Sequence, residues 1–105
     1  MSFHAKIQLK QRLPPMEFGF SLCRTPAGGL VTGPMATGTH NRVEIPVACP
    51  AGSRFTGLYH THPGGVALPS KTDTDSARKV GAKALCISSD TETRCQKVGM
   101  GMRKR

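Results

Sequence analysis

The apolar and polar positions along the chain predict short strands separated by turns, with one helix in the second half. Apolar residues alternate with polar ones, or run together briefly, and these stretches end at turns rich in Gly and Pro. One longer stretch is rich in helix formers, begins at Ser70 and is followed by Gly81, as expected for a capped helix at 70–80. We therefore expect an α+β fold, with strands at residues 17–24, 30–37, 42–48, 54–61, 83–88 and 93–98.

The composition limits the protein to a small core. The chain has 105 residues, of which 37% are hydrophobic, with one Tyr, four Phe and no Trp. We assign residues 1–105 to one domain with its core at about 17–98, and a bound metal could add to its stability. Residues 1–15 are basic and could hold a short strand or helix at 5–13, while 99–105 is a basic tail expected to fray.

No stretch of the sequence has the character of a membrane span. No apolar run approaches the roughly 18 residues that a membrane helix needs. Residues 1–10 also lack the apolar core of a signal peptide. We therefore expect a soluble protein of the cytoplasm.

The charge balance favours acidic partners. Fifteen Lys and Arg residues against six Asp and Glu residues give a formal net charge of +9. Such a field attracts nucleic acid or acidic protein substrates. The cations are scattered and cluster only at 103–105, and few aromatic side chains are available to stack bases. A protein substrate is therefore favoured over nucleic acid.

The four cysteines lack the paired spacing of a structural zinc site. In a reducing cytosol they would be buried thiols, the default interpretation, whereas intracellular proteins of hyperthermophiles keep disulfides. Two of them fall on predicted strands joined by a turn at 88–92, where they could face each other. The sequence leaves both redox states open for Cys23, Cys49, Cys86 and Cys95.

The stretch 59–73 carries the candidate chemistry. His60 and His62 lie two positions apart on a predicted strand, so both imidazoles project to the same face. A loop rich in Gly and Pro follows, and Ser70 begins the helix with Asp73 in its first turn. The two imidazoles and the carboxylate can therefore meet at one edge of the fold.

Two interpretations of this stretch compete. Ser-x-x-Asp is a common helix-capping pattern, and an isolated His-x-His pair is weak evidence for a metal. Together, separated only by a short loop, they favour a metal site of His60, His62 and Asp73. Two histidines and one carboxylate leave a fourth position for water, as in hydrolytic zinc sites, although other divalent ions also bind such ligands.

This spacing resembles the JAMM motif of the JAB/MPN metalloprotease family. The motif reads His60-x-His62-Pro63, then six residues, then Ser70-x-x-Asp73. By resemblance, the two histidines and the aspartate bind Zn²⁺. Ser70 stabilises the oxyanion, and an upstream glutamate is the general base. The resemblance also implies a compact JAB/MPN-like (cytidine-deaminase-like) mixed β-sheet, with at least one helix after the metal loop.

The upstream glutamate of the motif is assigned to Glu17. A glycine follows it two places on, one place nearer than in the family pattern. A carboxylate on an apolar strand is unfavourable to bury unless a cation or donor lies beside it, and a metal site would supply one. The alternative is an edge-strand glutamate that faces solvent. Glu44 alternates with apolar neighbours and is expected to face water, and it remains the second candidate for the base.

The resemblance implies a zinc metallopeptidase that cleaves an amide or isopeptide bond. Glu17 would move the proton of a zinc-activated water, while Ser70 and the metal stabilise the oxyanion. Small prokaryotic members suggest protein substrates that end in Gly-Gly, either ubiquitin-like modifiers or sulfur-carrier proteins. The chain has little room for the insertions that grip ubiquitin in deubiquitinating members, and it could cover its sheet by forming a homodimer.

Two other functions remain open. RadC-like proteins, which are linked to DNA, carry a similar motif, and both Pro69-Ser70 and the positive charge fit them. Thr61, however, stands where those proteins usually carry Asn, and a salt-sensitive affinity for DNA would distinguish the two. Some MPN domains are non-catalytic binding modules, but these have usually lost ligands that this chain retains.

Overall fold

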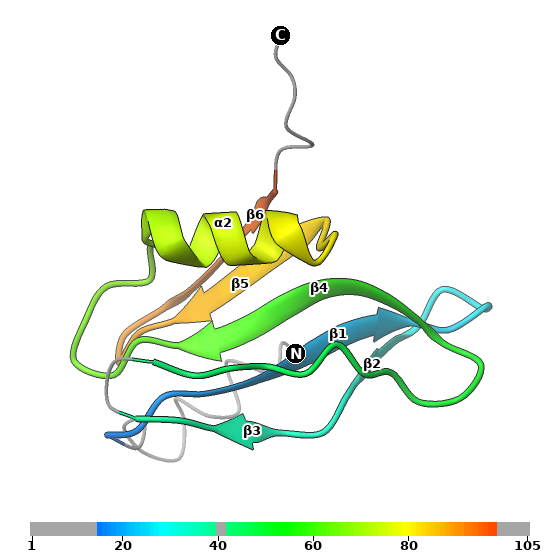
Figure 1. Cartoon of the computed structure of the whole chain (residues 1–105), viewed down its shortest axis with the longest axis horizontal. Helices are drawn as coiled ribbons and strands as arrows, with labels where there is room; N and C mark the ends of the chain where they lie inside the picture. The colour runs from blue at the N-terminus through cyan, green and yellow to red at the C-terminus, as the bar shows by residue number, and fades with distance from the viewer. Residues whose placement is uncertain (1–14, 40–41, 99–105) are drawn as a thin grey trace, which may run out of the picture.

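A computed structural model describes residues 15–39 and 42–98 of the chain. They form one mixed sheet with a helix lying over one face (Figure 1). The predicted strand or helix at 5–13 and the tail at 99–105 lie outside these residues. The elements are β1 (Phe18–Arg24), β2 (Leu30–Thr32), β3 (Ala36–Thr37), β4 (Arg54–Thr61), α2 (Lys71–Lys79), β5 (Ala84–Ser88) and β6 (Thr93–Lys97).

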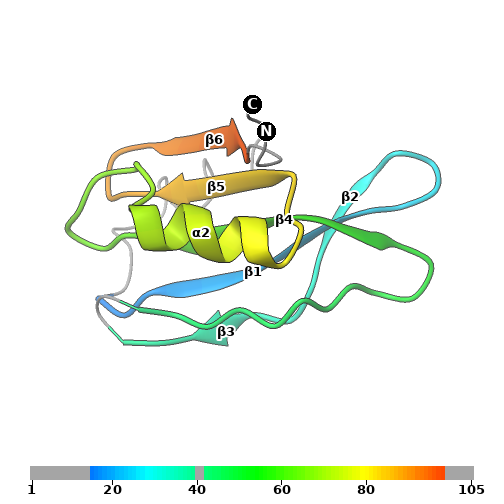
Figure 2. The same cartoon turned by 45° about the horizontal axis from the view of Figure 1, so that its top comes forward.

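The sheet follows the order β2-β1-β4-β5-β6, and β3 also pairs with β1. β1 is antiparallel to its three partners, β4 and β5 are parallel, and β5 and β6 are antiparallel. Parallel neighbours need a crossover connection, and here the crossover contains α2, which lies across β4 and β5 (Figure 2). The start of α2 therefore lies near the carboxyl end of β4, the central strand of the sheet.

The two faces of the sheet carry separate apolar clusters. Beneath α2, the buried residues come from β4, β5, the helix, the turn that follows it and the residue after β6: Leu58, Ala77, Ala82, Leu85, Ile87 and Val98. On the opposite face, Phe18, Phe20 and Tyr59 pack together, and the rings of Phe20 and Tyr59 stack with centroids 4.8 Å apart. Because side chains alternate along a strand, His60 shares the helix side with Leu58.

The predicted strand at 42–48 is wrong. Apart from an isolated bridge between Thr39 and Arg42, these residues pair with no strand in the described part of the chain. Pro46 has no N–H to donate to a ladder. The neighbouring backbone groups bond instead to a side chain of β1: the Ser21 hydroxyl donates to the Pro46 carbonyl (2.7 Å) and accepts from the Ala48 N–H (3.3 Å). This segment therefore packs on the face of β1 as an irregular wall.

The predicted strand at 30–37 divides into β2 and β3 at Gly33. A Cβ at this position would lie 2.1 Å from the Ala48 carbonyl oxygen, so only glycine permits so close an approach of the wall. The Gly33 N–H still donates to the Ser21 carbonyl oxygen at 3.0 Å.

All four cysteines are paired, so the interpretation as buried thiols is wrong. Cys86 and Cys95 lie opposite each other on β5 and β6, as their predicted positions allowed. Cys23 of β1 is bonded to Cys49 at the end of the irregular wall. Among the described residues, no helix is long and apolar enough to cross a membrane.

Candidate metal centre

The end of β4 places the two histidines of the motif together. His60 opposes Gly19 of β1 and is buried, with 7% of its side chain exposed. His62 follows the last residue of the strand, and its backbone N–H donates to the Ser88 carbonyl oxygen (2.8 Å), which continues the alternation of the strand. The two imidazole centroids are 5.0 Å apart. The two imidazole rings therefore project from the same face of the strand, as predicted.

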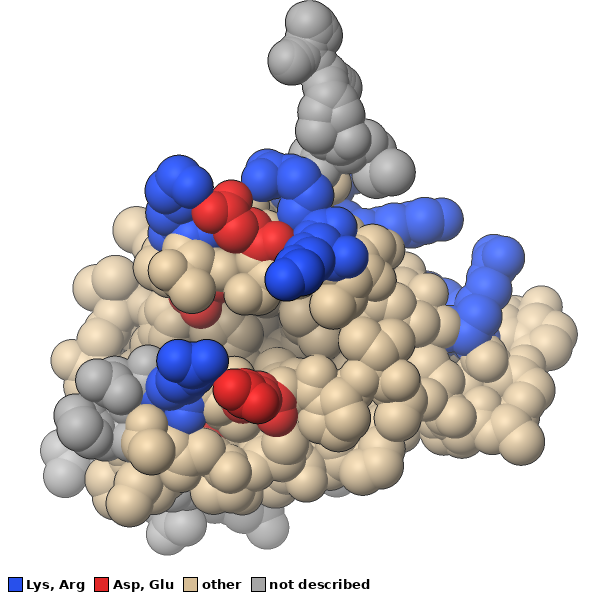
Figure 3. All heavy atoms as spheres, viewed as in Figure 1, with Lys and Arg blue, Asp and Glu red and all other residues tan. Residues whose placement is uncertain are grey.

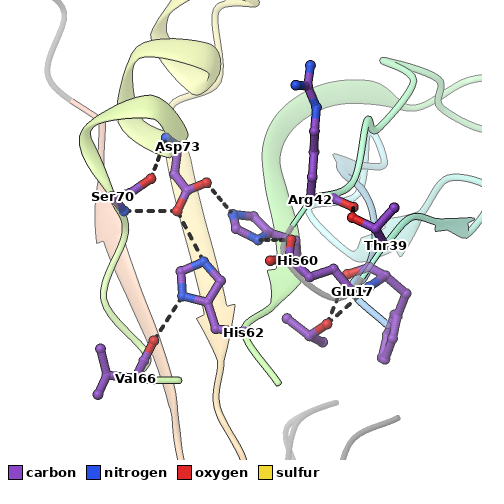
Figure 4. A network of polar contacts seen from close by, with 10 residues as sticks. Glu17, Thr39, Arg42, His60, His62, Val66, Ser70 and Asp73 are labelled. Atoms are coloured by element: carbon purple, nitrogen blue, oxygen red, sulfur yellow. Dashed lines mark hydrogen bonds and ion pairs between the residues drawn. The ribbon is translucent and has the colours of Figure 1, made fainter. Parts of the chain in front are cut away.

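The start of α2 brings Asp73 to these rings. Ser70 is the N-cap: its hydroxyl accepts from the Asp73 N–H (3.1 Å), and Asp73 Oδ2 accepts from the Ser70 N–H (2.9 Å). The same carboxylate lies 3.1 Å from His62 Nε2 through Oδ2 and 3.6 Å from His60 Nε2 through Oδ1 (Figure 4). The capping and metal-site interpretations therefore do not exclude each other, because the capping box aims the carboxylate at the histidines.

His60, His62 and Asp73 form a group that could hold a metal ion. One ligand atom from each lies within 4.8 Å of the other two. His62 Nδ1 faces the Val66 carbonyl oxygen at 2.9 Å, a contact that leaves Nε2 for a metal and fixes the ring orientation. Two imidazoles and one carboxylate match the ligand types of zinc. The residues present therefore fit the predicted ion.

The pKa values of the three groups follow from their surroundings. Burial lowers the pKa of His60, so its ring stays neutral, as a metal ligand must. The hydrogen bond to Asp73 raises the pKa of His62. Burial by itself would raise the pKa of Asp73, but hydrogen bonds from His62 and from the Ser70 backbone lower it to about 2. The carboxylate is therefore ionised at neutral pH, and a metal at His62 Nε2 would take the place of a proton.

Glu17, the predicted base, lies beside this group. Its side chain is 9% exposed, and Oε1 lies 3.9 Å from His60 Nδ1. No hydrogen-bond partner for that buried nitrogen is found among the described residues. The backbone of Glu17 is fixed on both sides: its N–H donates to the Thr39 carbonyl oxygen (2.7 Å), and its carbonyl accepts from Gly38 (2.8 Å). Glu17 directly precedes β1 and, contrary to the alternative interpretation, does not face solvent.

Thr61, the residue between the two histidines, joins the end of β4 to the start of β1, beside Glu17. Its hydroxyl accepts a hydrogen bond from the Phe18 N–H at 3.0 Å and is buried. The bond joins the end of β4 to the residue after Glu17, across 43 positions of sequence. Sequence reasoning missed this role, because nothing in the local pattern shows which backbone group a buried threonine will meet.

The second candidate for the base, Glu44, lies on the rim. Its side chain is 84% exposed and forms an ion pair with Arg42 at 3.1 Å. The expectation that it faces water is confirmed. Its carboxylate belongs to the irregular wall and is not among the groups that could hold the metal.

A cleft of about 820 Å³ opens over the candidate metal site. Figure 3 shows it as a hollow between the charged groups on α2 and those on the irregular wall. Glu17, His60, Ser70 and Asp73 all line it. Ser70 accepts the cap bond through oxygen and keeps its own hydroxyl hydrogen for donation toward the cleft. The site is thus open to a chain-like ligand from solvent.

The comparisons with known proteins agree with this geometry. A JAB1/MPN domain protein from Archaeoglobus fulgidus has a similar structure, with a TM-score of 0.55 and 21% sequence identity, over 89% of this chain and 82% of that chain. At this identity the likeness establishes the fold. No curated protein sequence matches the chain. A family model described as prokaryotic homologs of the JAB domain matches residues 24–99, which include His60, His62, Ser70 and Asp73 but not Glu17. The chain therefore belongs to the family of prokaryotic JAB-domain homologues.

Proposed function

We propose that this protein is a zinc-dependent hydrolase that cleaves an amide or isopeptide bond. The observation that carries the proposal is the position of Glu17, a buried carboxylate that borders the His60, His62 and Asp73 group at the bottom of an open cleft. A carboxylate on the Nδ1 side of a ligating histidine also orients the ring in structural sites, but Glu17 in addition lines the cleft, where hydrolysis needs a base.

The residues divide the chemistry between them. His60, His62 and Asp73 would hold zinc, which supplies a water ionised near neutral pH. Glu17 accepts a proton from the attacking water on its carboxylate and delivers it to the leaving nitrogen. The Ser70 hydroxyl, in the cleft, donates to the oxygen of the carbonyl that is attacked.

The substrate that fits best is the flexible tail of a protein. The cleft opens to solvent between α2 and the irregular wall, so it can admit an extended chain. A tail ending in Gly-Gly, as in ubiquitin-like modifiers and sulfur carriers, suits a site whose reacting groups lie at the bottom of the cleft. Association with DNA and a purely binding function are the competing outcomes of the experiment below.

The test combines zinc content with cleavage of a Gly-Gly-linked ubiquitin-like fusion, for the wild type, Asp73→Ala and Glu17→Gln. We expect one zinc per chain in the wild type and Glu17→Gln, none in Asp73→Ala, and cleavage by the wild type only. Zinc without cleavage of any fusion would favour a binding module, and a salt-sensitive affinity for DNA in the same preparation would favour the DNA-linked function. Absence of zinc from the wild type would contradict the proposal.

A further inference from the structure

The cleft continues along α2, past the candidate metal ligands. Asp73 and Ser76 line it on the helix, followed one turn later by Lys79 and Val80. These positions recur at helical spacing, so they form one face that looks into the cleft. The floor beyond His60 is apolar, with Leu58 of β4 and Leu85 of β5, and the irregular wall closes the other side with Val43 and Ile45.

Lys79 differs from the other cations of this helix. Lys71 and Arg78 both form ion pairs with Asp75, at 2.6 and 3.3 Å. No carboxylate of the described residues forms an ion pair with Lys79, although the six Asp and Glu of the chain all lie among those residues. On the opposite wall, the charge of Arg42 is matched by Glu44. Among the described residues that line the cleft, Lys79 is thus the cation that forms no ion pair, and its charge is available to a ligand.

The spacing along the helix gives the distance between Asp73, at the candidate metal site, and the charge of Lys79. Lys79 is six positions after Asp73 in the sequence, which is about 9 Å at the rise of an α-helix. An extended chain advances about 3.3 Å per residue, so this distance corresponds to roughly three residues.

We propose that Lys79 and the exposed apolar surface of Val80, above the buried floor of Leu58 and Leu85, form a subsite for an acidic side chain, preferably Glu, about three residues before the bond that is cut. The apolar surface accommodates the methylene groups, and Lys79 neutralises the carboxylate. The preferred tail would then read Glu-Gly-Gly. This inference rests on the proposed function for the position of the cut bond.

Binding of short peptides tests the subsite without requiring turnover. Fluorescently labelled peptides ending in Glu-Gly-Gly, Gln-Gly-Gly or Lys-Gly-Gly are titrated with zinc-loaded Glu17→Gln protein, which should bind without cutting. We expect the Glu peptide to bind about fivefold more tightly than the Gln peptide, and the Lys peptide to bind most weakly. Lys79→Met should remove the preference, and Lys79→Glu should reverse it in favour of the Lys peptide.

The matched control is Lys83→Met, which removes the same charge from an exposed residue that does not line the cleft. It should keep the full preference for Glu. An equal loss of preference in both variants would reduce the effect to net charge and overturn the subsite, as would failure of all three peptides to bind.

Cleavage of matching fusions separates the two proposals. A wild type that discriminates among the peptides but cuts no fusion would support the subsite and contradict the hydrolase. A wild type that cuts Glu-Gly-Gly and Gln-Gly-Gly fusions with equal kcat/KM, and whose rates do not change in Lys79→Met, would support the hydrolase and overturn the subsite.

Discussion

The two sides of the cleft are built in different ways. The metal side takes His60, His62 and Asp73 from β4 and α2, which one loop connects, and a capping box aims the carboxylate. The side of the proposed base, or base side, takes Glu17 from the position before β1 and its wall from residues 42–49, which form no ladder with other described residues. Side-chain hydrogen bonds and the Cys23–Cys49 disulfide hold that wall in place.

Because the two sides are built differently, zinc affinity, turnover and stability should not all respond to the same substitutions. The metal side depends on local secondary structure, so zinc affinity should be insensitive to changes in β1 and the wall. The base side depends on contacts between distant parts of the chain, so changes there should affect turnover and stability before zinc binding.

Substitution of Glu17 by Gln should stop turnover while leaving the metal bound. Loss of a general base lowers kcat by about 10²- to 10⁴-fold, and the carboxylate is not one of the three grouped ligands. The measurement is kcat on a Gly-Gly fusion together with zinc content. Glu44→Gln is the control and should keep wild-type kcat, because its side chain is exposed on the rim. The opposite result would transfer the role of base to Glu44.

Removal of the Cys23–Cys49 disulfide should destabilise the protein with little change in zinc affinity. This bond closes a separation of 26 residues, for which loop entropy predicts a loss of about 3.5 kcal/mol in the free energy of unfolding. The Cys86–Cys95 bond closes only 9 residues and should contribute about 2.6 kcal/mol by the same argument. Urea unfolding and zinc titration of the two double Cys→Ala variants give the measurement. A tenfold loss of zinc affinity on removing Cys23–Cys49 would show that the two sides are not independent.

Replacement of Thr61 by Val should affect the base side from within the metal motif. The change leaves the buried Phe18 N–H without its acceptor, which destabilises the fold by about 1–3 kcal/mol. Because Glu17 adjoins Phe18, loss of this bond should displace the Glu17 carboxylate. We expect kcat to fall about tenfold, since a small displacement of a catalytic group slows a reaction. Thr61→Ser retains the hydroxyl and should restore most of the rate. Equal kcat values for Val and Ser variants, measured on zinc-saturated protein, would refute this positioning role.

The smallest effect concerns the pH dependence of stability in protein stripped of metal with a chelator. The pKa of Asp73 is lowered to about 2, so its stabilising interactions are present above pH 4 and are lost as the pH falls toward 2. The pKa of His62 is raised, so the stability that the protein gains from the contact of His62 with Asp73 is lost as the pH rises through the pKa of His62 in the folded state. The free energy of unfolding of the wild type should exceed that of Asp73→Asn by on the order of 1 kcal/mol near pH 5. A difference that stays constant from pH 3 to 8 in urea unfolding would contradict this coupling.

The sequence predicted the second half of the fold more accurately than the first. The predicted strand at 54–61, helix at 70–80 and strands at 83–88 and 93–98 correspond to β4, α2, β5 and β6 within two residues at each end. These elements have clear local signals: alternation, a serine cap and a turn between strands. The segment at 42–48 has alternation too, but an apolar residue every second position is equally compatible with packing on a neighbour as an irregular wall. Pro46 was the signal against a ladder.

The sequence by itself determined the candidate ligand group. His60 and His62 are two positions apart along a strand, and Asp73 is the third residue of a capped helix. This local structure fixes the directions of their side chains, whatever the rest of the fold does. Only the tertiary structure decided that the Glu17 carboxylate lies beside His60, that Cys23 pairs with Cys49, and that Lys79 lines the cleft. These depend on contacts between β1, the wall and α2, and a chain reveals such contacts only when distant segments pack against each other.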